Sequence, residues 1–209
     1  MFLTNTCKKD EELANKITDK DGNIYTSVTI GTQVWMVENL KATKYSDGTP
    51  IPNATNYIEG TNLTVGAYCW YDNDIANKTP YGGLYNRYAV NTDKICPTGW
   101  HLPSDSEFVT LATFLGGEAV AGSKLKESGT THWIYPNIGA TNESGFTAVP
   151  GGVRYDNGQF GNLGAVCYLF SSAESPNYAW IYTIYHSEST FNGGLGVKKG
   201  WFSVRCLKN

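Results

Sequence analysis

The sequence contains few positively charged residues and no long apolar segment. Of its 209 residues 16 are lysine or arginine and 19 are aspartate or glutamate, which gives a formal net charge of −3 at pH 7. Nucleic-acid-binding proteins carry a basic face along the phosphate backbone, so we exclude nucleic acid as a partner. The sequence also lacks an apolar run of about 18 residues, and it therefore predicts no membrane-spanning helix.

Histidine is scarce as well. The three histidines, His101, His132 and His186, stand far apart in the sequence. The patterns His-x-x-x-His, Cys-x-x-Cys and Gly-x-Ser-x-Gly, which are typical of zinc sites, redox sites and serine hydrolases, do not occur. The glycine-rich segment 158–164 precedes no expected helix, whereas a phosphate-binding loop needs one. We therefore expect no metal, no cofactor and no enzyme activity.

Aromatic residues and glycine are abundant instead. The chain has 14 tyrosines, 8 phenylalanines, 6 tryptophans and 23 glycines, while only 17% of its residues are charged. This composition favours short strands, many turns and a core of large rings. A length of 209 residues suits one large domain, alone or with a short tail.

Residues 1–18 differ from residues 19–209, which form the predicted domain. Residues 1–6 are apolar and then small and polar, like the end of a signal peptide, and a lone Cys7 follows. Residues 8–16 are mostly charged, which predicts a solvated tether. The segment resembles a bacterial lipoprotein cleavage site with a lipidated cysteine, and the charges after it resemble the surface-export signal of Bacteroidetes lipoproteins. The alternative is a frayed, charged terminus with an incidental cysteine.

Two segments of the body have the pattern of a helix. Residues 81–90 carry apolar residues at helical spacing, although they include two glycines. The second helix follows Pro103, because Ser104 and Glu107 form a capping box and Gly116-Gly117 ends the apolar stripe. After this helix the chain is expected to consist almost wholly of strands and turns.

The expected strands are short and separated by turn residues. They are residues 24–30 and 34–37 in an N-terminal hairpin, 146–155 leading into the turn Asp156-Asn157-Gly158, 166–171, 178–186 and 201–207. A few helices followed by many short strands indicate an α+β fold and not an alternating α/β fold.

A series of motifs, here called the family motifs, resembles the Fibrobacter succinogenes major paralogous domain from Asp19 to Lys208. They are Asp-x-Asp-Gly-Asn at 19–23, Gly-x-Gln-x-Trp-Met-x-Glu-Asn-Leu at 31–40, Tyr-Gly-Gly-Leu-Tyr at 81–85, Cys-Pro-x-Gly-Trp-His-Leu-Pro-Ser-Asp at 96–105, Gly-Phe-Thr-Ala-Val-Pro-Gly-Gly-Val-Arg at 145–154, Ser-Ser-Ala-Glu at 171–174 and Phe-Ser-Val-Arg-Cys-Leu at 202–207. The chain departs from the family at 167–170, where Cys-Tyr-Leu-Phe replaces tryptophans, and at Asn77-Lys78, where many members have a cysteine. No molecular function is established for this domain.

The resemblance implies a C-type-lectin-like fold, in which two helices flank a small antiparallel sheet with a long loop region. The segment 96–107 is similar to the Cys…Gly-x-x-Leu-Pro…Glu signature of that fold, which formylglycine-generating enzymes share. The same resemblance implies a disulfide between Cys96 and Cys206. The pairing of Cys69 with Cys167 stays open, because both are equally plausible as buried free thiols.

The predicted ligand-binding surface lies in the loops between residues 153 and 200. Rings among glycine, asparagine and serine are hard to bury, and exposed rings beside polar groups are typical of recognition surfaces. The candidate residues are Arg154, Tyr155, Phe160, Glu174, Tyr185, His186, Phe191 and Asn192. We expect several of these rings to cluster on one face away from Cys7, and their replacement to weaken binding without loss of stability. The alternative places them in the core.

Together these features predict a non-catalytic, adhesin-like binding module. We expect it to be exported and lipid-anchored at the outer membrane or surface of a bacterial cell, where it binds a glycan or a protein. The membrane is expected as a partner only through the lipid. The alternatives are an enzyme related to the formylglycine-generating proteins and a purely structural module of the envelope. The sequence indicates no oligomeric state.

The lipid tether is directly testable. Cys7 is expected to carry lipid in the native cell, so that the protein appears in the membrane fraction, whereas Cys7→Ser moves it to the soluble fraction. Stable anchoring requires more than one acyl chain, which the modified cysteine supplies. Mass spectrometry of the N-terminal peptide is the measurement. A mature protein that begins elsewhere and has a free Cys7 thiol contradicts this prediction.

Overall fold

The computed structural model describes residues 16–55, 63–173, 178–197 and 199–209. Within them the chain has a mixed α+β fold, with several antiparallel sheets, 14 strands and four α-helices. The expected α+β class is therefore confirmed. The expected pair of helices around one small sheet is wrong, because the strands form two larger sheets and two short hairpins. The predicted Glu174 lies outside the described residues.

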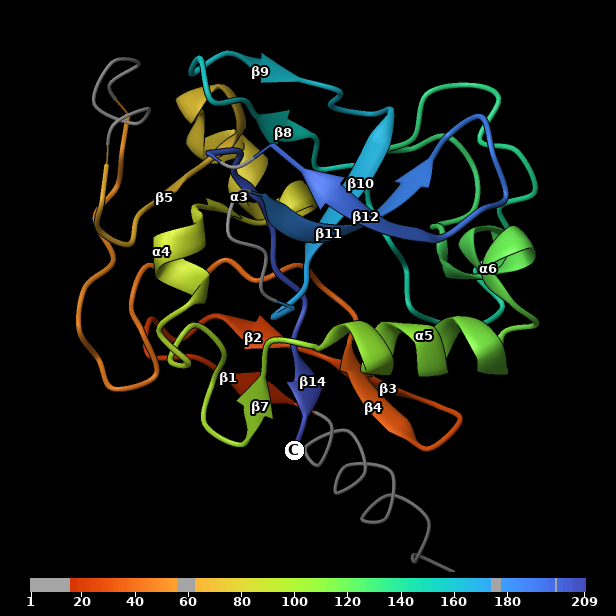
Figure 1. The fold of residues 1–209 in the computed structure, drawn as a ribbon, viewed down its shortest axis with the longest axis horizontal. Helices are drawn as coiled ribbons and strands as arrows, with labels where there is room; N and C mark the ends of the chain where they lie inside the picture. Colours follow the sequence, from red (N-terminus) through yellow and green to blue (C-terminus); the bar gives the residue numbers. More distant parts are fainter. Residues whose placement is uncertain (1–15, 56–62, 174–177, 198) are drawn as a thin grey trace, which may run out of the picture.

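The larger sheet has six strands in the order β12-β11-β10-β13-β6-β5 (Figure 1). Its strands are β5 (Tyr68–Cys69), β6 (Leu84–Tyr85), β10 (Val166–Phe170), β11 (Ala179–Tyr185), β12 (Asn192–Gly196) and β13 (Phe202–Ser203). All neighbours are antiparallel except β10 and β13, which are parallel. The predicted strands 166–171 and 178–186 are present as the neighbouring strands β10 and β11 of this sheet.

The second sheet has four strands in the order β3-β4-β14-β7. Its strands are β3 (Ser27–Ile30), β4 (Gln33–Met36), β7 (Trp100–His101) and β14 (Leu207–Lys208). Two separate hairpins pair β1 (Ile17–Thr18) with β2 (Ile24–Tyr25), and β8 (Val153–Arg154) with β9 (Phe160–Gly161). The predicted N-terminal hairpin is present as β3 and β4, and the predicted hairpin around residues 156–158 as β8 and β9. The β1–β2 hairpin has no counterpart in the sequence-based prediction. β1 falls within the residues that the sequence assigns to the tether, so the folded body begins before residue 19.

The helices differ most from the sequence-based prediction. α5 (Asp105–Phe114) has the predicted capping box at Ser104, but α6 (Glu118–Leu125) follows it in a region predicted to be strand and turn. The predicted helix 81–90 does not form. The short helix α3 (Lys78–Tyr81) ends where it should begin, and the strand β6 and the short helix α4 (Arg87–Val90) follow. The two remaining helical elements are the 3₁₀ turns η1 (Tyr71–Asn73) and η2 (Ile75–Asn77).

Gly82 explains why the helix stops. Its φ of +78° lies in the left-handed region, and a Cβ there would come within 2.7 Å of the Cβ of Asn39 and 2.8 Å of the carbonyl oxygen of Leu40. Gly83 N then donates a hydrogen bond to Leu40 O (2.8 Å). The two glycines thus allow the backbone of this segment to pack directly against residues 39–40. A continuous helix over 81–90 would prevent this contact.

The predicted strand 201–207 divides between the two sheets. β13 belongs to the six-stranded sheet and β14 to the four-stranded sheet, so residues 204–206 form the crossing between them. The backbone of the crossing is held by Leu40, whose N–H donates to Val204 O (2.8 Å), and by Met36, whose N–H donates to Cys206 O (3.0 Å). A strand pattern alone does not specify which sheet each half joins.

Arg205 lies in this crossing and is fully buried. Asn39 Oδ1 accepts hydrogen bonds from its Nε (3.2 Å) and Nη2 (2.7 Å), and Phe146 O accepts one from Nη1. The Phe146 ring lies 4.3 Å from the guanidinium. Thr147, whose carbonyl is 3.5 Å from Nη2, has a φ of +54°, which is an unusual value for a β-branched residue.

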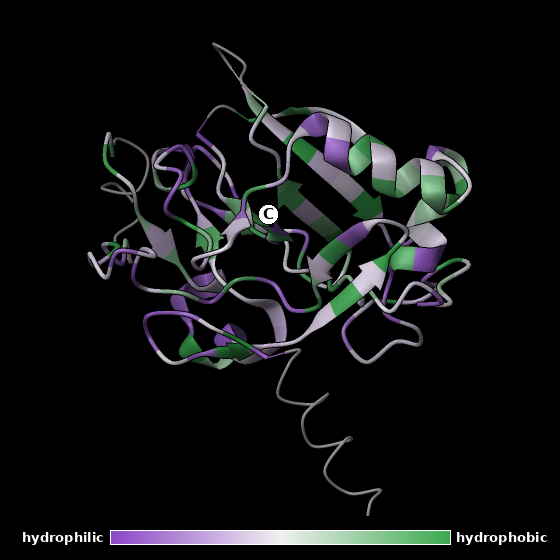
Figure 2. Ribbon diagram, turned by 90° about the horizontal axis from the view of Figure 1, so that it is seen from below, coloured by the Kyte–Doolittle hydropathy of each residue, from purple (hydrophilic) through white to green (hydrophobic). Residues whose placement is uncertain are grey.

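The core consists of large rings between the sheets and α5. Phe108 of α5 contacts Trp35 of β4 (ring centroids 5.2 Å apart) and stacks on Tyr182 of β11 (4.4 Å), so one helix joins the two sheets. Figure 2 shows that apolar residues gather on the central strands, while polar and apolar residues alternate along the helices. The predicted aromatic core is therefore confirmed. No helix among the described residues is long and apolar enough to span a membrane.

Of the five cysteines, Cys7, the predicted lipidation site, lies outside the described residues, and the structure assigns the other four. Cys96 and Cys206 form a disulfide with their Cα atoms 5.9 Å apart, as the family resemblance implies. Cys69 and Cys167 are buried free thiols, so the second pairing does not exist. Burial raises the pKa of each of these thiols to about 12, which keeps both in the neutral form at neutral pH.

Lys126 provides a test of how the loops after α6 are held. Its buried ammonium donates to three carbonyls, those of Ile138 (2.7 Å), Tyr185 (3.2 Å) and Glu188 (2.7 Å). Lys126→Met leaves the Ile138 and Glu188 carbonyls without this donor and Tyr185 O with only the longer bond from the Glu188 N–H (3.4 Å). The substitution is expected to lower the free energy of unfolding by about 3 kcal/mol. Urea denaturation measures the loss.

The matched control is Lys124→Met on the same turn of chain. Lys124 makes an ion pair with Glu143 (2.9 Å) near the surface, so its loss is expected to cost less than about 1 kcal/mol. Equal losses for the two variants would contradict the role assigned to Lys126.

Candidate functional site

Three tyrosines meet in a groove on the outer face of the six-stranded sheet. Tyr155 follows β8, Tyr168 lies on β10 and Tyr185 ends β11, so the rings come from three separate segments. The groove has a volume of about 270 Å³. It is lined by Val153, Tyr155, Tyr168, Ile181, Thr183, Tyr185, Gly194, Leu195, Gly196, Val197 and Phe202. We call this the tyrosine groove.

Asn162 fixes two of the rings. Its side-chain amide donates hydrogen bonds to the hydroxyl oxygen of Tyr155 (3.0 Å) and to that of Tyr168 (2.8 Å). Asn162 itself has a φ of +62°, a conformation that asparagine tolerates better than most residues. Burial raises the pKa of Tyr168 to about 12, so its hydroxyl stays protonated at neutral pH. The groove is therefore preorganised and neutral.

Glycine brings the edge strand β12 close to the groove floor. A Cβ at Gly196 would lie 2.8 Å from the Ile181 Cδ1 atom and 3.1 Å from the Phe202 ring, so a larger residue would push the strand away. Leu195, between Gly194 and Gly196, is 57% exposed and borders the groove. None of the lining residues is charged. The surface suits a ligand with uncharged, partly apolar faces.

Only two of the eight predicted binding residues meet in this groove, namely Tyr155 and Tyr185. Both are half-buried, with part of each ring accessible. Asn192 is exposed on β12, and its carbonyl accepts a hydrogen bond from Thr183 Oγ1 (3.3 Å). His186 is half-buried, and its Nδ1 has no hydrogen-bond partner among the described residues.

Phe191 corrects the predicted surface, because its ring is fully buried. It packs against Phe108 (centroids 5.8 Å apart) and Tyr182 (4.9 Å). The backbone N–H of Phe191 also donates to Glu118 O (2.8 Å) at the start of α6. The ring is therefore enclosed by α5 and β11, while its backbone is held by α6, a helix that the sequence analysis does not predict.

Arg154 and Phe160 belong to a different cluster. Arg154 is buried, donates a hydrogen bond to Ala54 O (2.6 Å) and lies between the rings of Phe160 (5.4 Å) and Trp201 (5.0 Å). Phe160 also contacts Tyr71 (5.2 Å). Arg154, a predicted ligand-binding residue, therefore does not lie on an accessible surface, because the arginine joins the β8–β9 hairpin to the core.

Sequence reasoning missed Tyr168 and Asn162. Tyr168 carried a usable signal, since strand alternation places it on the face opposite Cys167 and Leu169. Asn162 lies in a glycine-rich turn, where its type is ordinary, and only the folded hairpin brings its amide to the two hydroxyls.

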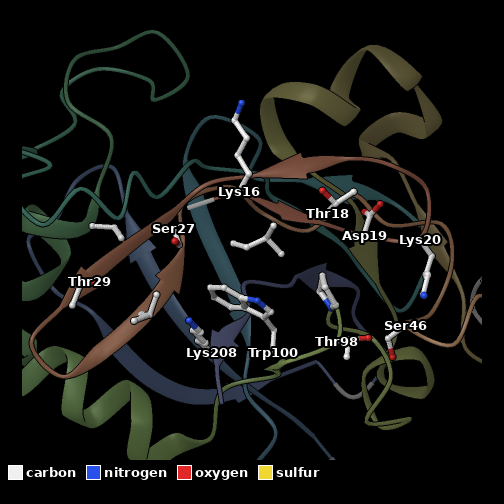
Figure 3. A pocket seen from close by; sticks show the side chains of 14 residues that line it. Lys16, Thr18, Asp19, Lys20, Ser27, Thr29, Ser46, Thr98, Trp100 and Lys208 are labelled. Atoms are coloured by element: carbon white, nitrogen blue, oxygen red, sulfur yellow. The ribbon is translucent and has the colours of Figure 1, made fainter. Parts of the chain in front are cut away.

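A second hollow lies over the four-stranded sheet (Figure 3). It measures about 860 Å³ and lies between the β1–β2 hairpin and strands β3, β7 and β14. Its lining includes Lys16, Lys20 and Lys208 around the half-buried ring of Trp100. We call this the Trp100 pocket. In Figure 1 strands β1, β7 and β14 lie at one end of the molecule and β8 and β9 at the other.

A third cavity, of about 400 Å³, includes Glu127, His132 and Arg205 in its lining. His132 Nδ1 lies 2.9 Å from both carboxylate oxygens of Glu127. The hydroxyl of Thr147, which also lines the cavity, donates to Gly145 O (3.3 Å) and accepts from Asn142 (2.9 Å). Both bonds of the Thr147 hydroxyl are therefore taken up within its own loop, and this hydroxyl is not free to join the His132–Glu127 pair. Among the described residues no group of three metal-ligating side chains forms.

Comparison with known proteins gives one match. The family model described as the Fibrobacter succinogenes major domain (Fib_succ_major) matches residues 28–208. The matched range includes the tyrosine groove and the β7 and β14 side of the Trp100 pocket, but not the β1–β2 hairpin that forms its other side. No curated protein matches the chain, and neither does any solved structure.

The core position of Phe191 predicts a large effect on stability. Phe191→Ala removes a ring that is wholly buried and is expected to lower the free energy of unfolding by about 3–5 kcal/mol. Urea unfolding followed by fluorescence measures it. Tyr135→Ala is the control, since Tyr135 is 85% exposed and its loss should change stability by less than about 0.5 kcal/mol. A similarly small effect at Phe191 would contradict the burial described above.

Proposed function

The chain belongs to the Fibrobacter succinogenes major domain family, and from this membership and the geometry of the site we propose that it is a non-catalytic binding module. Its ligand docks in the tyrosine groove and is a neutral glycan or an uncharged segment of a protein. The observation that carries the proposal is the convergence of Tyr155, Tyr168 and Tyr185 from three segments into one uncharged groove.

The rings have the properties of a recognition surface. Tyrosine offers a large, rigid contact area at a low cost in conformational entropy, together with a hydroxyl that makes hydrogen bonds. Asn162 holds Tyr155 and Tyr168 in place before any ligand arrives, which reduces the ordering cost of binding. The accessible face of each ring is then available to stack against a sugar ring or an apolar side chain.

The proposal includes a C-type-lectin-like arrangement of the domain. The Cys96–Cys206 disulfide joins the segment before α5 to the last strands, as the resemblance implies for that fold. α5 begins at the predicted capping box and packs between the two sheets. The tyrosine groove lies among strands and loops that follow these helices, where the binding loops of such a fold are expected.

We place the protein outside the cytosol, anchored by lipid at Cys7 to the surface of a bacterial cell. A disulfide that closes a separation of 110 residues favours an oxidising environment. Strand β8, which contributes Val153 to the groove, and β1, the first described element, lie at opposite ends of the view in Figure 1. A tether that leads into β1 would leave the groove facing outward.

The enzyme alternative has less support. A formylglycine-generating type of chemistry needs a reactive thiol, and the candidates are Cys69 and Cys167. Both are buried, and burial raises their pKa to about 12, whereas reactive cysteines have a lowered pKa and an open approach. A purely structural module of the envelope has no use for a preorganised, accessible groove.

Tyr185→Ala tests the groove. The protein is first screened against printed arrays of neutral glycans and of proteins, and binding to the best ligand is then measured by calorimetry. Removing the ring is expected to weaken binding about tenfold, because a central aromatic contact contributes at least about 1.4 kcal/mol. Thermal melting of the variant checks that the fold persists.

Tyr135→Ala provides the matched comparison. It removes the same side chain from an exposed loop outside the groove and should leave affinity unchanged. If both variants bind as the native protein does, the ligand occupies another surface and the groove is not the binding site.

A further inference from the structure

The Trp100 pocket is chemically different from the tyrosine groove. Figure 3 shows the Trp100 ring in the middle of the lining side chains, with Lys208 beside it and residues of the β1–β2 hairpin around the rim. Trp100 and Lys208 are direct partners in neighbouring strands β7 and β14. Cross-strand partners point to the same face of a sheet, so an indole and an ammonium lie side by side on the floor.

The lysines of this pocket are uncommitted. In the described part of the chain, four lysines have side chains that make no ion pair, hydrogen bond or ring contact, namely Lys16, Lys20, Lys199 and Lys208. Three of these four line this one pocket. The net charge of the chain is −3, so this pocket is locally positive on a protein that is negative as a whole.

The one carboxylate in the lining offsets only one of the three lysine charges. Asp19 Oδ2 accepts hydrogen bonds from Tyr25 (2.6 Å) and from the side chain of Asn23 (2.8 Å). Its Oδ1 accepts from the backbone N–H groups of Asp21 and Asn23, both at 2.9 Å. All the hydrogen bonds that Asp19 accepts thus come from the turn between β1 and β2 and from Tyr25 at its end. The pocket therefore presents an excess of positive charge to a ligand.

Five hydroxyl groups surround the same space. Thr18, Ser27, Thr29, Ser46 and Thr98 line the pocket. None of these hydroxyls makes a hydrogen bond to another described residue. A ligand rich in hydroxyl groups would find both donors and acceptors around the rim.

We propose that the Trp100 pocket binds an acidic saccharide, meaning a sugar chain that carries carboxylate or sulfate groups. The indole of Trp100 stacks on the apolar C–H face of one sugar ring, the free hydroxyls bond its hydroxyl groups, and the lysines pair with its anionic groups. The volume of about 860 Å³ accommodates more than one sugar ring. This site is separate from the tyrosine groove, whose lining has no charge.

The lining favours a saccharide over a nucleic acid. Phosphate-rich ligands are typically gripped by the forked guanidinium of arginine and by several stacking rings in a row. Here the lining contains no arginine and a single aromatic ring, while hydroxyl side chains outnumber the lysines. Lysines act as separate point charges, which matches the spaced anionic groups of a sugar chain.

Calorimetry with the full chain tests the proposal. The probes are an oligogalacturonate and a sulfated galactan oligosaccharide, with a neutral cello-oligosaccharide of equal length as the comparison. At least one anionic probe is expected to bind, and its affinity should fall as NaCl rises from about 0.05 to about 0.5 M, because salt screens exposed charges. Lys20→Ala and Lys208→Ala should each weaken binding up to about fivefold.

Lys199→Ala is the matched control, since Lys199 is equally exposed and unpaired within the described residues but lies outside the pocket. It should bind normally, and so should Tyr185→Ala, which separates this proposal from that of the groove. Trp100→Ala should lower the affinity for the anionic probe at least about tenfold. Because Trp100 also packs on the core, the lysine variants decide the question if this variant fails to fold. Equal binding of the neutral probe, no binding of either anionic probe, an equal loss at Lys199, or preferential binding of an oligothymidylate would overturn the proposal.

Discussion

The burial of Arg205 is the constraint on which the rest of this structure depends. A fully buried guanidinium must have its hydrogen bonds satisfied, and here the acceptors come from Asn39 and from the carbonyls of Phe146 and Thr147. Asn39 in turn donates to Tyr81 O (2.9 Å). Four of the family motifs, at 31–40, 81–85, 145–154 and 202–207, thus meet around one charge. Residues from all four motifs surround the same guanidinium, which explains why segments so far apart in the sequence belong to one pattern.

The same crossing of the chain organises the two sheets. Arg205 stands between β13 and β14, and the adjacent Cys206 is bonded to Cys96, so one short segment joins the six-stranded sheet, the four-stranded sheet and the loop before α5. Phe108 of α5 then fills the space between the sheets by contacting a ring from each. Since these elements fix one another, the outer strands β12 and β1 are free to carry surfaces that serve no purpose in the core.

Those surfaces differ in chemistry as well as position. The tyrosine groove is uncharged and preorganised by Asn162, whereas the Trp100 pocket collects lysines and hydroxyls that have no partner within the described protein. In Figure 1 strand β8, beside the groove, and strand β1, beside the pocket, lie at opposite ends of the molecule. Only one side of the Trp100 pocket falls within the residues that match the family model, so the β1–β2 hairpin is where this chain has room to differ from other members.

The sequence by itself determined the features that depend on local chemistry: the α+β class, the capped helix α5, the two hairpins with their turn residues, and an aromatic core. Its family motifs also implied the Cys96–Cys206 disulfide. Tertiary structure alone decided which side chains are exposed, because burial depends on what covers a residue. The rings of Phe108 and Tyr182 cover Phe191, and those of Phe160 and Trp201 flank Arg154. It likewise ended the helix expected at 81–90, since the close approach of Gly82 to Asn39 is a contact between segments that no local pattern encodes.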